Sequence, residues 1–165
     1  MRQLGSVSVA HRGGQEASLP AGVEELLLDV VADGFTRYCC GPKVAPTALL
    51  ACYQWPGCVD LFTVRDFGRV ITARVPTLGR RVDIFAPEVV VWAYEGAPQH
   101  ALRALLDLVH PEHPDAPTVS YPAPAGLRVP RAQQRPMAIQ LPRPGRARVR
   151  EQRLASAITA PVAAR

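Results

Sequence analysis

The amino-acid sequence predicts an α+β fold, in which an N-terminal and a C-terminal helix pack on an antiparallel sheet of about five strands. A disordered Arg/Pro-rich tail is expected to follow the fold. Two segments carry the apolar repeat of an amphipathic helix, and the residues between them form runs typical of β-strands. The predicted division is a disordered N-terminal segment over residues 1–18, a folded domain over residues 19–119 and the tail over residues 120–165.

The first helix is indicated by apolar residues that recur every three or four positions between Val23 and Val31. Ser18 suits the N-cap position, and Pro20 suits the first turn. Gly34 lies where a helix usually ends in the left-handed conformation. We therefore expect a helix between Ser18 and Gly34.

Runs rich in β-branched and aromatic residues come next, separated by turn residues such as Gly41-Pro42. These runs cover residues 35–40, 47–55, 59–64 and 70–75. Short connections join antiparallel neighbours, and Asp66-Phe67-Gly68 is interpreted as a hairpin turn. Residues 88–95 resume as an apolar strand, whose lack of alternation predicts a central position covered on both faces.

The second helix is predicted to begin near Pro98, which suits a first-turn position. Leu102, Leu105 and Val109 continue the apolar stripe, and Pro111 cannot extend the helix. Both helices therefore offer one apolar face to the sheet.

Composition places this chain among globular proteins, because 48% of its 165 residues are hydrophobic and 20% are charged. No apolar run of a signal peptide follows the first residues, and no apolar run approaches the roughly 20 residues that cross a bilayer. We therefore expect a cytoplasmic protein without a membrane association. The single lysine, eighteen arginines and lack of asparagine are typical of a GC-rich bacterial genome.

The four cysteines are Cys39, Cys40, Cys52 and Cys58. In a reducing compartment such residues are buried thiols and not disulfides. Their spacing does not match a zinc knuckle, so the sequence implies no cofactor.

A polar group follows the second helix and contains two imidazoles and two carboxylates, from His110, Glu112, His113 and Asp115. Histidine is the commonest protein ligand for metals, so these four are candidate metal ligands. The alternative is a turn that ends the helix, where a histidine interacts favourably with the helix dipole.

The tail differs sharply in charge from the rest of the chain. Residues 1–119 hold 10 basic and 13 acidic side chains, whereas residues 120–165 hold nine basic side chains and one acidic one. Five of the arginines lie close together: Arg143, Arg146, Arg148, Arg150 and Arg153. Such a cluster can bind phosphates electrostatically or add affinity for a protein partner. Residues 149–159 could form a short helix that becomes ordered on a partner.

Three functions remain open from the sequence. The favoured one is a small non-enzymatic binding or regulatory accessory protein, because a mildly acidic body that binds a protein partner is followed by a basic tail that can add affinity. An enzyme is less favoured, since the chain carries none of the motifs GxxxxGK[ST], GxSxG or HExxH. A nucleic-acid-associated protein that uses its basic tail is the second. A small metal-binding protein or enzyme at His110–Asp115 is the third. Open sheet edges also make a homodimer an expected possibility.

Overall fold

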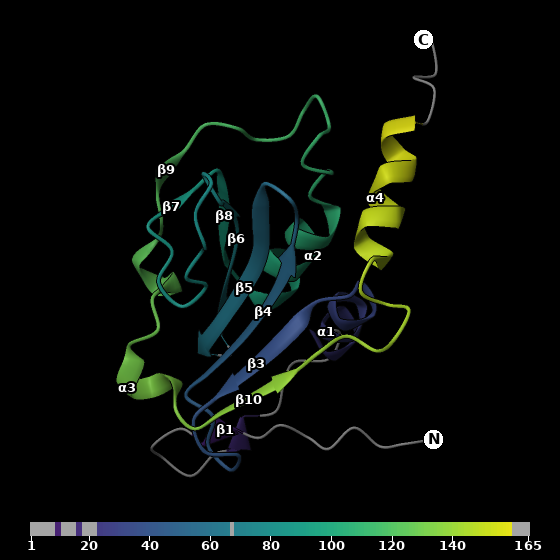
Figure 1. Cartoon of the computed structure of the whole chain (residues 1–165). Helices are drawn as coiled ribbons and strands as arrows, with labels where there is room; N and C mark the ends of the chain where they lie inside the picture. Colours follow the sequence, from purple (N-terminus) through teal and green to yellow (C-terminus); the bar gives the residue numbers. More distant parts are fainter. Residues whose placement is uncertain (1–8, 11–15, 18–22, 67, 160–165) are drawn as a thin grey trace.

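The architecture is organised around a six-stranded antiparallel sheet with the strand order β10-β3-β4-β5-β6-β8 (Figure 1). The computed structural model describes residues 9–10, 16–17, 23–66 and 68–159. The strands of the sheet are β3 (Thr36–Cys40), β4 (Ala48–Gln54), β5 (Cys58–Asp66), β6 (Arg69–Pro76), β8 (Trp92–Gly96) and β10 (Met137–Gln140). The prediction of an antiparallel sheet is confirmed, with one strand more than expected.

Hairpins build the centre of the sheet. β4 and β5 are joined around Pro56-Gly57, and β5 and β6 are joined at the predicted turn, where Asp66 pairs with Arg69. Phe67 itself lies outside the described residues. β5 has strand neighbours on both sides, and residues 58–64 of this strand are all buried.

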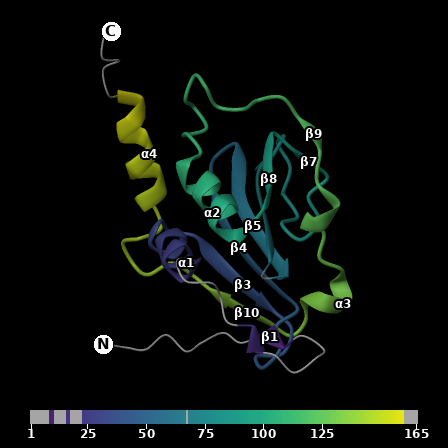
Figure 2. The same cartoon turned by 180° about the vertical axis from the view of Figure 1, so that it is seen from behind.

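Both predicted helices lie on one face of the sheet (Figure 2), α1 at Val23–Ala32 and α2 at Pro98–Asp107. α2 begins at Pro98 as expected, and its Leu102 and Leu105 are fully buried. α1 ends at Ala32, and Gly34 follows with a φ of 102°, which glycine adopts freely and which is strained for other residues. The proposed N-cap, Ser18, lies outside the described residues.

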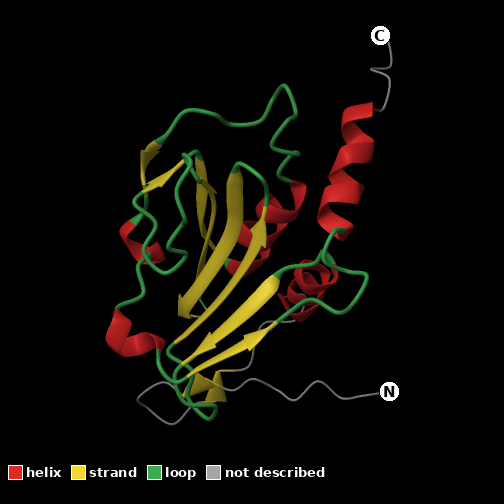
Figure 3. Ribbon diagram, in the orientation of Figure 1, coloured by secondary structure: helices red, strands yellow, loops and turns green. Residues whose placement is uncertain are grey.

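Each face of the sheet carries its own apolar core, because successive side chains of a strand point to opposite faces. In β4, Ala51 and Tyr53 pack under the helices, whereas Leu50 and Cys52 pack on the other face. That second face is covered by the irregular segments 82–90 and 123–129 (Figure 3). We refer to the two sides as the helix-covered face and the loop-covered face.

The predicted strand over residues 88–95 is not central. It is divided into β7 (Val89–Val90), which pairs with β9 (Tyr121–Pro122), and β8, which is the outermost strand beside β6. Val90 is buried in the loop-covered core, but Tyr94 and Glu95 are exposed. The run lacks alternation because its two halves belong to different sheets.

The structure also differs from the predicted disordered tail over residues 120–159. Besides β9 and β10, this segment forms η1 (Ala125–Leu127), α3 (Arg131–Gln134) and α4 (Val149–Thr159). Leu127 and Val129 fill the loop-covered core, and the Val129 N–H donates to the Phe85 carbonyl at 2.7 Å. Prolines interrupt regular structure here, yet enough apolar side chains remain to anchor the segment. Residues 160–165 lie outside the described residues.

In the N-terminal segment predicted to be disordered, the described residues are few. β1 (Val9–Ala10) and β2 (Glu16–Ala17) form a two-residue antiparallel ladder. The other residues of the range 1–18 lie outside the described part of the chain.

Candidate functional site

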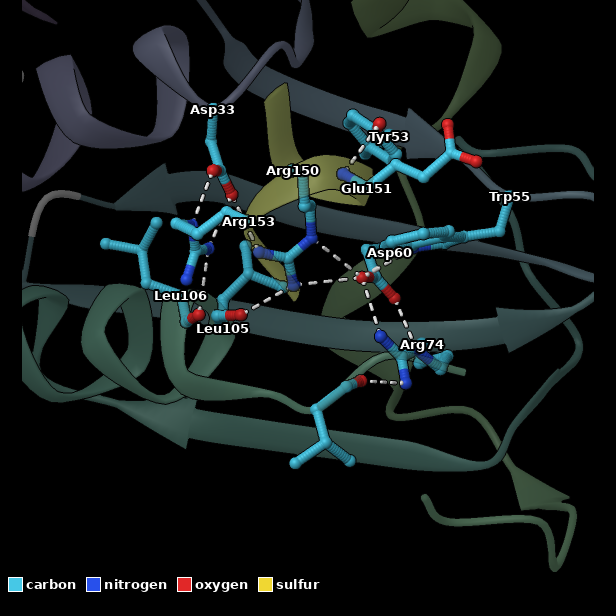
Figure 4. A network of polar contacts seen from close by, with 11 residues as sticks. Asp33, Tyr53, Trp55, Asp60, Arg74, Leu105, Leu106, Arg150, Glu151 and Arg153 are labelled. Carbon is cyan, nitrogen blue, oxygen red and sulfur yellow. Dashed lines mark hydrogen bonds and ion pairs between the residues drawn. The ribbon is translucent and has the colours of Figure 1, made fainter. Parts of the chain in front are cut away.

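A buried ionic network lies where the sheet, α1, α2 and α4 meet (Figure 4). It consists of two carboxylates and three guanidiniums, from Asp33, Asp60, Arg74, Arg150 and Arg153. Asp60 and Arg150 have no exposed surface, and Asp33 is 4% exposed. Charges this deep must be paired, because their transfer from water costs several kcal/mol per ion.

Asp60 of β5 is the centre of the network. Arg74 of β6 binds it through two parallel hydrogen bonds, from Nε to Oδ1 at 2.6 Å and from Nη2 to Oδ2 at 2.9 Å. Trp55 donates from Nε1 to Oδ2 at 2.9 Å, and Arg150 of α4 donates to the same oxygen from Nε and Nη2. Paired charge-assisted bonds of this kind are among the strongest in proteins.

Asp33, directly after α1, forms the second centre. It accepts a bond from Arg150 Nη1 at 2.8 Å and two bonds from Arg153, from Nε at 2.9 Å and from Nη2 at 2.8 Å. Burial by itself raises the pKa of Asp33, but the hydrogen bonds and charges of Arg153 and Arg150 outweigh burial and hold this pKa below its ordinary value of 3.8. Asp33 is therefore a carboxylate at neutral pH.

The arginines also bind the carboxyl end of α2. Arg150 donates to the Leu105 carbonyl at 2.8 Å, and Arg153 donates to the Leu106 carbonyl at 3.1 Å. Arg74 donates to the carbonyl of Val109, just beyond the helix, at 2.8 Å. The last carbonyls of a helix lack partners within it and carry partial negative charge, so guanidiniums suit this position.

The network joins α4 to the rest of the fold. The Arg150 guanidinium lies 5.4 Å from the centroid of the Phe35 ring, and Leu154 enters the core beneath the helices. The N–H of Glu151 donates to the Tyr53 hydroxyl at 3.2 Å, so the first turn of α4 is bonded to β4 as well. Every charged group of the network is committed to an internal partner. We therefore interpret it as a structural clamp and not as a reactive centre.

Sequence reasoning missed this clamp, although part of it leaves a signal. Asp60 and Arg74 interrupt apolar strands and lie at equal distances from Phe67 in the hairpin turn, and the structure pairs them directly. Two opposite charges at facing positions in a buried hairpin predict a cross-strand ion pair. Arg150 leaves no comparable signal, because it follows Asp60 by 90 residues.

The predicted metal ligands form two turns. His110 Nδ1 accepts the N–H of Glu112 at 3.1 Å, and His113 Nδ1 accepts the N–H of Asp115 at 3.0 Å. The His110 ring packs edge-on against Trp55, with 4.8 Å between the ring centroids. Within the described ranges, no group of three or more His, Cys, Asp or Glu side chains is arranged to hold a metal ion. These contacts match the alternative reading of this segment as a helix-ending turn.

The five clustered tail arginines do not form one basic surface. Arg150 and Arg153 belong to the clamp, and Arg148 pairs with Glu151 at 2.9 Å. Arg143 and Arg146 are exposed, and neither forms an ion pair within the described part of the chain. The structure thus reduces the number of arginines that can contact phosphates, and nucleic-acid binding by the tail stays a prediction.

All four cysteines are free thiols. Cys40, Cys52 and Cys58 are buried, as predicted, and Cys39 is half-buried. Burial, with a smaller contribution from the charge of Asp60, raises the pKa of Cys58 to about 12. Cys58 is accordingly protonated and inert at neutral pH.

The other surface of interest is the edge of the sheet at β10. Among the described residues, β10 has a strand neighbour on its β3 side alone. Met137 pairs with Cys40 and Ile139 with Tyr38, and the Gly41 N–H donates to the Pro136 carbonyl. In an antiparallel ladder hydrogen-bonded pairs alternate with non-bonded ones, so Ala138 and Gln140 bond to β3, and the backbone groups of Met137 and Ile139 point outward.

Side chains leave this edge accessible. Ile139 is 56% exposed, and Leu141, which follows the strand, is 77% exposed. Ala138 and Gln140 are exposed as well. An edge strand with outward backbone groups and exposed apolar side chains is a template for another strand. We define the β10 edge as residues 137–141.

The chain matches no known protein-family model, and comparison with curated protein sequences and with solved structures finds no significant match. No helix in the described part of the chain is both long and apolar enough to cross a membrane.

Proposed function

We propose that this chain is a small non-enzymatic accessory protein that binds an extended segment of a partner protein, added to the sheet beside β10. The observation that carries the proposal is the β10 edge, where the backbone groups of Met137 and Ile139 point away from β3. An added strand gains affinity from main-chain hydrogen bonds and specificity from alternate side chains. This mode of binding requires no catalytic group.

The rigidity of the edge supports the same proposal. β10 is held on one side by β3, and the chain beyond it is fixed by the clamp at Arg150. Gln134, just before the strand, donates from its amide to the Val129 carbonyl at 2.9 Å. A strand fixed at both ends is already in its binding conformation, which lowers the entropy lost on association.

A reducing compartment suits the thiols of this protein, since all four cysteines are free. We place the proposed binding in the bacterial cytoplasm on that basis, together with the composition. The partner is then another intracellular protein with an extended segment.

The test uses photo-crosslinking in the cells that make the protein. A photoreactive side chain replaces Gln140, and a control probe replaces Val119, which is 77% exposed in a loop. We expect one crosslinked protein from the Gln140 probe and none from the Val119 probe. The same probe is then combined with Ile139→Pro, which removes an outward N–H and keeps the bonds that Ala138 and Gln140 make to β3, as edge strands tolerate.

We expect Ile139→Pro to abolish the crosslink without a loss of folding, and Val119→Pro to leave the crosslink unchanged. Equal crosslinking from both probes would contradict the proposal. So would a crosslink that persists in Ile139→Pro, because main-chain pairing would then play no part. Crosslinking to nucleic acid in place of protein would favour the phosphate-binding alternative.

A further inference from the structure

The stretch of chain that contains the β10 edge lacks negative charge. Residues 116–150 include seven arginines and no acidic side chain, and β10 lies in the second half of this range. An exposed edge in such a stretch presents a positive potential to an approaching segment. The stretch of chain around the proposed binding surface is therefore basic.

Four basic side chains surround the strand. Arg37 lies on β3 directly opposite Gln140, and Arg135 and Arg143 precede and follow the strand. Lys43 lies in the turn after Gly41, whose N–H bonds to Pro136. All four are exposed, and none forms an ion pair within the described ranges. They remain available to anions at both ends of β10.

We infer that the segment bound beside β10 is an acidic peptide in extended conformation, with carboxylates alternating with apolar side chains. This inference rests on the proposed function and specifies its partner. Ile139 lies on the loop-covered face with Met137, so an added strand meets apolar groups on that face. Gln140 and Arg37 lie on the other face. The added strand would lie about 10 Å from β3, because β10 lies between them. A Glu side chain on the added strand and the Arg37 side chain together span this distance.

A second copy of this chain fits the edge poorly. An antiparallel pair of β10 strands centred on Ile139 uses the whole strand of each copy. That register brings Arg135 of each copy toward Arg143 of the other, at both ends of the pair. Like charges at facing positions are destabilising, so the edge favours an acidic strand over itself.

The experiment measures binding of three labelled, end-capped eight-residue peptides to the full chain by fluorescence anisotropy. The peptides alternate Val with Glu, with Gln or with Lys. We expect the Glu peptide to bind about tenfold tighter than the Gln peptide at low salt, from two or three exposed ion pairs, and the Lys peptide not to bind. The preference should decline at high salt.

Two variants separate charge from strand pairing. Arg37→Gln/Arg143→Gln should remove most of the preference for Glu over Gln, whereas Arg80→Gln/Arg103→Gln, which alters two exposed arginines elsewhere, should not. Ile139→Pro should abolish binding of the Glu peptide and of the Gln peptide. Hydrogen exchange should show protection of the Met137 and Ile139 amides on binding.

Each of the remaining outcomes contradicts a specific part of the proposal. Equal binding of all three peptides, lost in Ile139→Pro, leaves strand addition standing and overturns the acidic partner. Binding of the Glu peptide that Ile139→Pro does not change overturns the proposed function and this inference with it. Absence of binding by all three peptides overturns the inference. A dimer of the peptide-free protein in sedimentation, lost in Ile139→Pro, overturns it because a second copy then occupies the edge.

Discussion

Replacement of Arg150 by methionine tests whether the clamp holds the C-terminal segment in place. Arg150 donates four hydrogen bonds, two to Asp60, one to Asp33 and one to the Leu105 carbonyl, and has no exposed surface. Methionine keeps an unbranched apolar side chain and removes the charge and all four donors. The variant therefore isolates the polar contribution of one side chain.

The expected loss of free energy of unfolding depends on the ion pairs that Asp60 and Asp33 keep in Arg150→Met. Removal of one member of a buried ion pair costs about 3–5 kcal/mol when it leaves a charge without a partner. Here Asp60 keeps Arg74 and Asp33 keeps Arg153, so neither carboxylate is left alone. We therefore expect the free energy of unfolding to fall by the lower end of this range, about 3 kcal/mol. With a urea m-value of about 2 kcal/mol/M, the unfolding midpoint falls by about 1.5 M.

Urea denaturation followed by tryptophan fluorescence measures the shift of the unfolding midpoint, because Trp55 contacts Asp60. Arg146→Met is the matched control, since Arg146 is exposed and forms no ion pair within the described part of the chain; we expect a change within about 0.5 kcal/mol. Asp60→Asn should cost more than Arg150→Met, because it leaves Arg74 buried without a carboxylate. Equal midpoints for Arg150→Met and Arg146→Met would refute the clamp.

Three further predictions follow from the same structure. Because the pKa of Asp33 is held below 3.8, its contribution to the free energy of unfolding is complete above that pH and is lost as pH falls through the lower folded value; urea midpoints between pH 6 and 2.5 should show this loss, and Asp33→Asn should reduce it. With the pKa of Cys58 at about 12, a thiol reagent at pH 8 should modify half-buried Cys39 first and Cys58 only in denaturant, and fast modification of Cys58 in the folded protein would contradict its burial. Gly34→Ala should cost more than about 1 kcal/mol in urea denaturation, because φ is 102° and the added Cβ would collide with the Arg146 carbonyl; an unchanged midpoint would argue against the placement of residues 146–147.

The main elements of the domain were predictable because their signals are local. The apolar repeat of α1 and the proline at the start of α2 belong to single helices, and the turn at Asp66-Phe67-Gly68 belongs to a single hairpin. Hairpin pairing also makes the Asp60–Arg74 ion pair readable in principle, since the turn sets which residues face each other. Position within the sheet was not readable, and the strand at residues 88–95 was therefore misplaced.

The sequence by itself determined the α+β class, the start of α2, the antiparallel hairpins and the contrast between an acidic body and a basic C-terminal third. Only the tertiary structure decided where that third lies. Pro-rich composition favours disorder as long as a segment has nothing to pack on. Here Leu127 and Val129 cover one face of the sheet, β10 extends it, and Arg150 meets carboxylates 90 and 117 residues earlier in the chain. Contacts over such separations leave no periodic signal, because they form only after the sheet has brought their partners together.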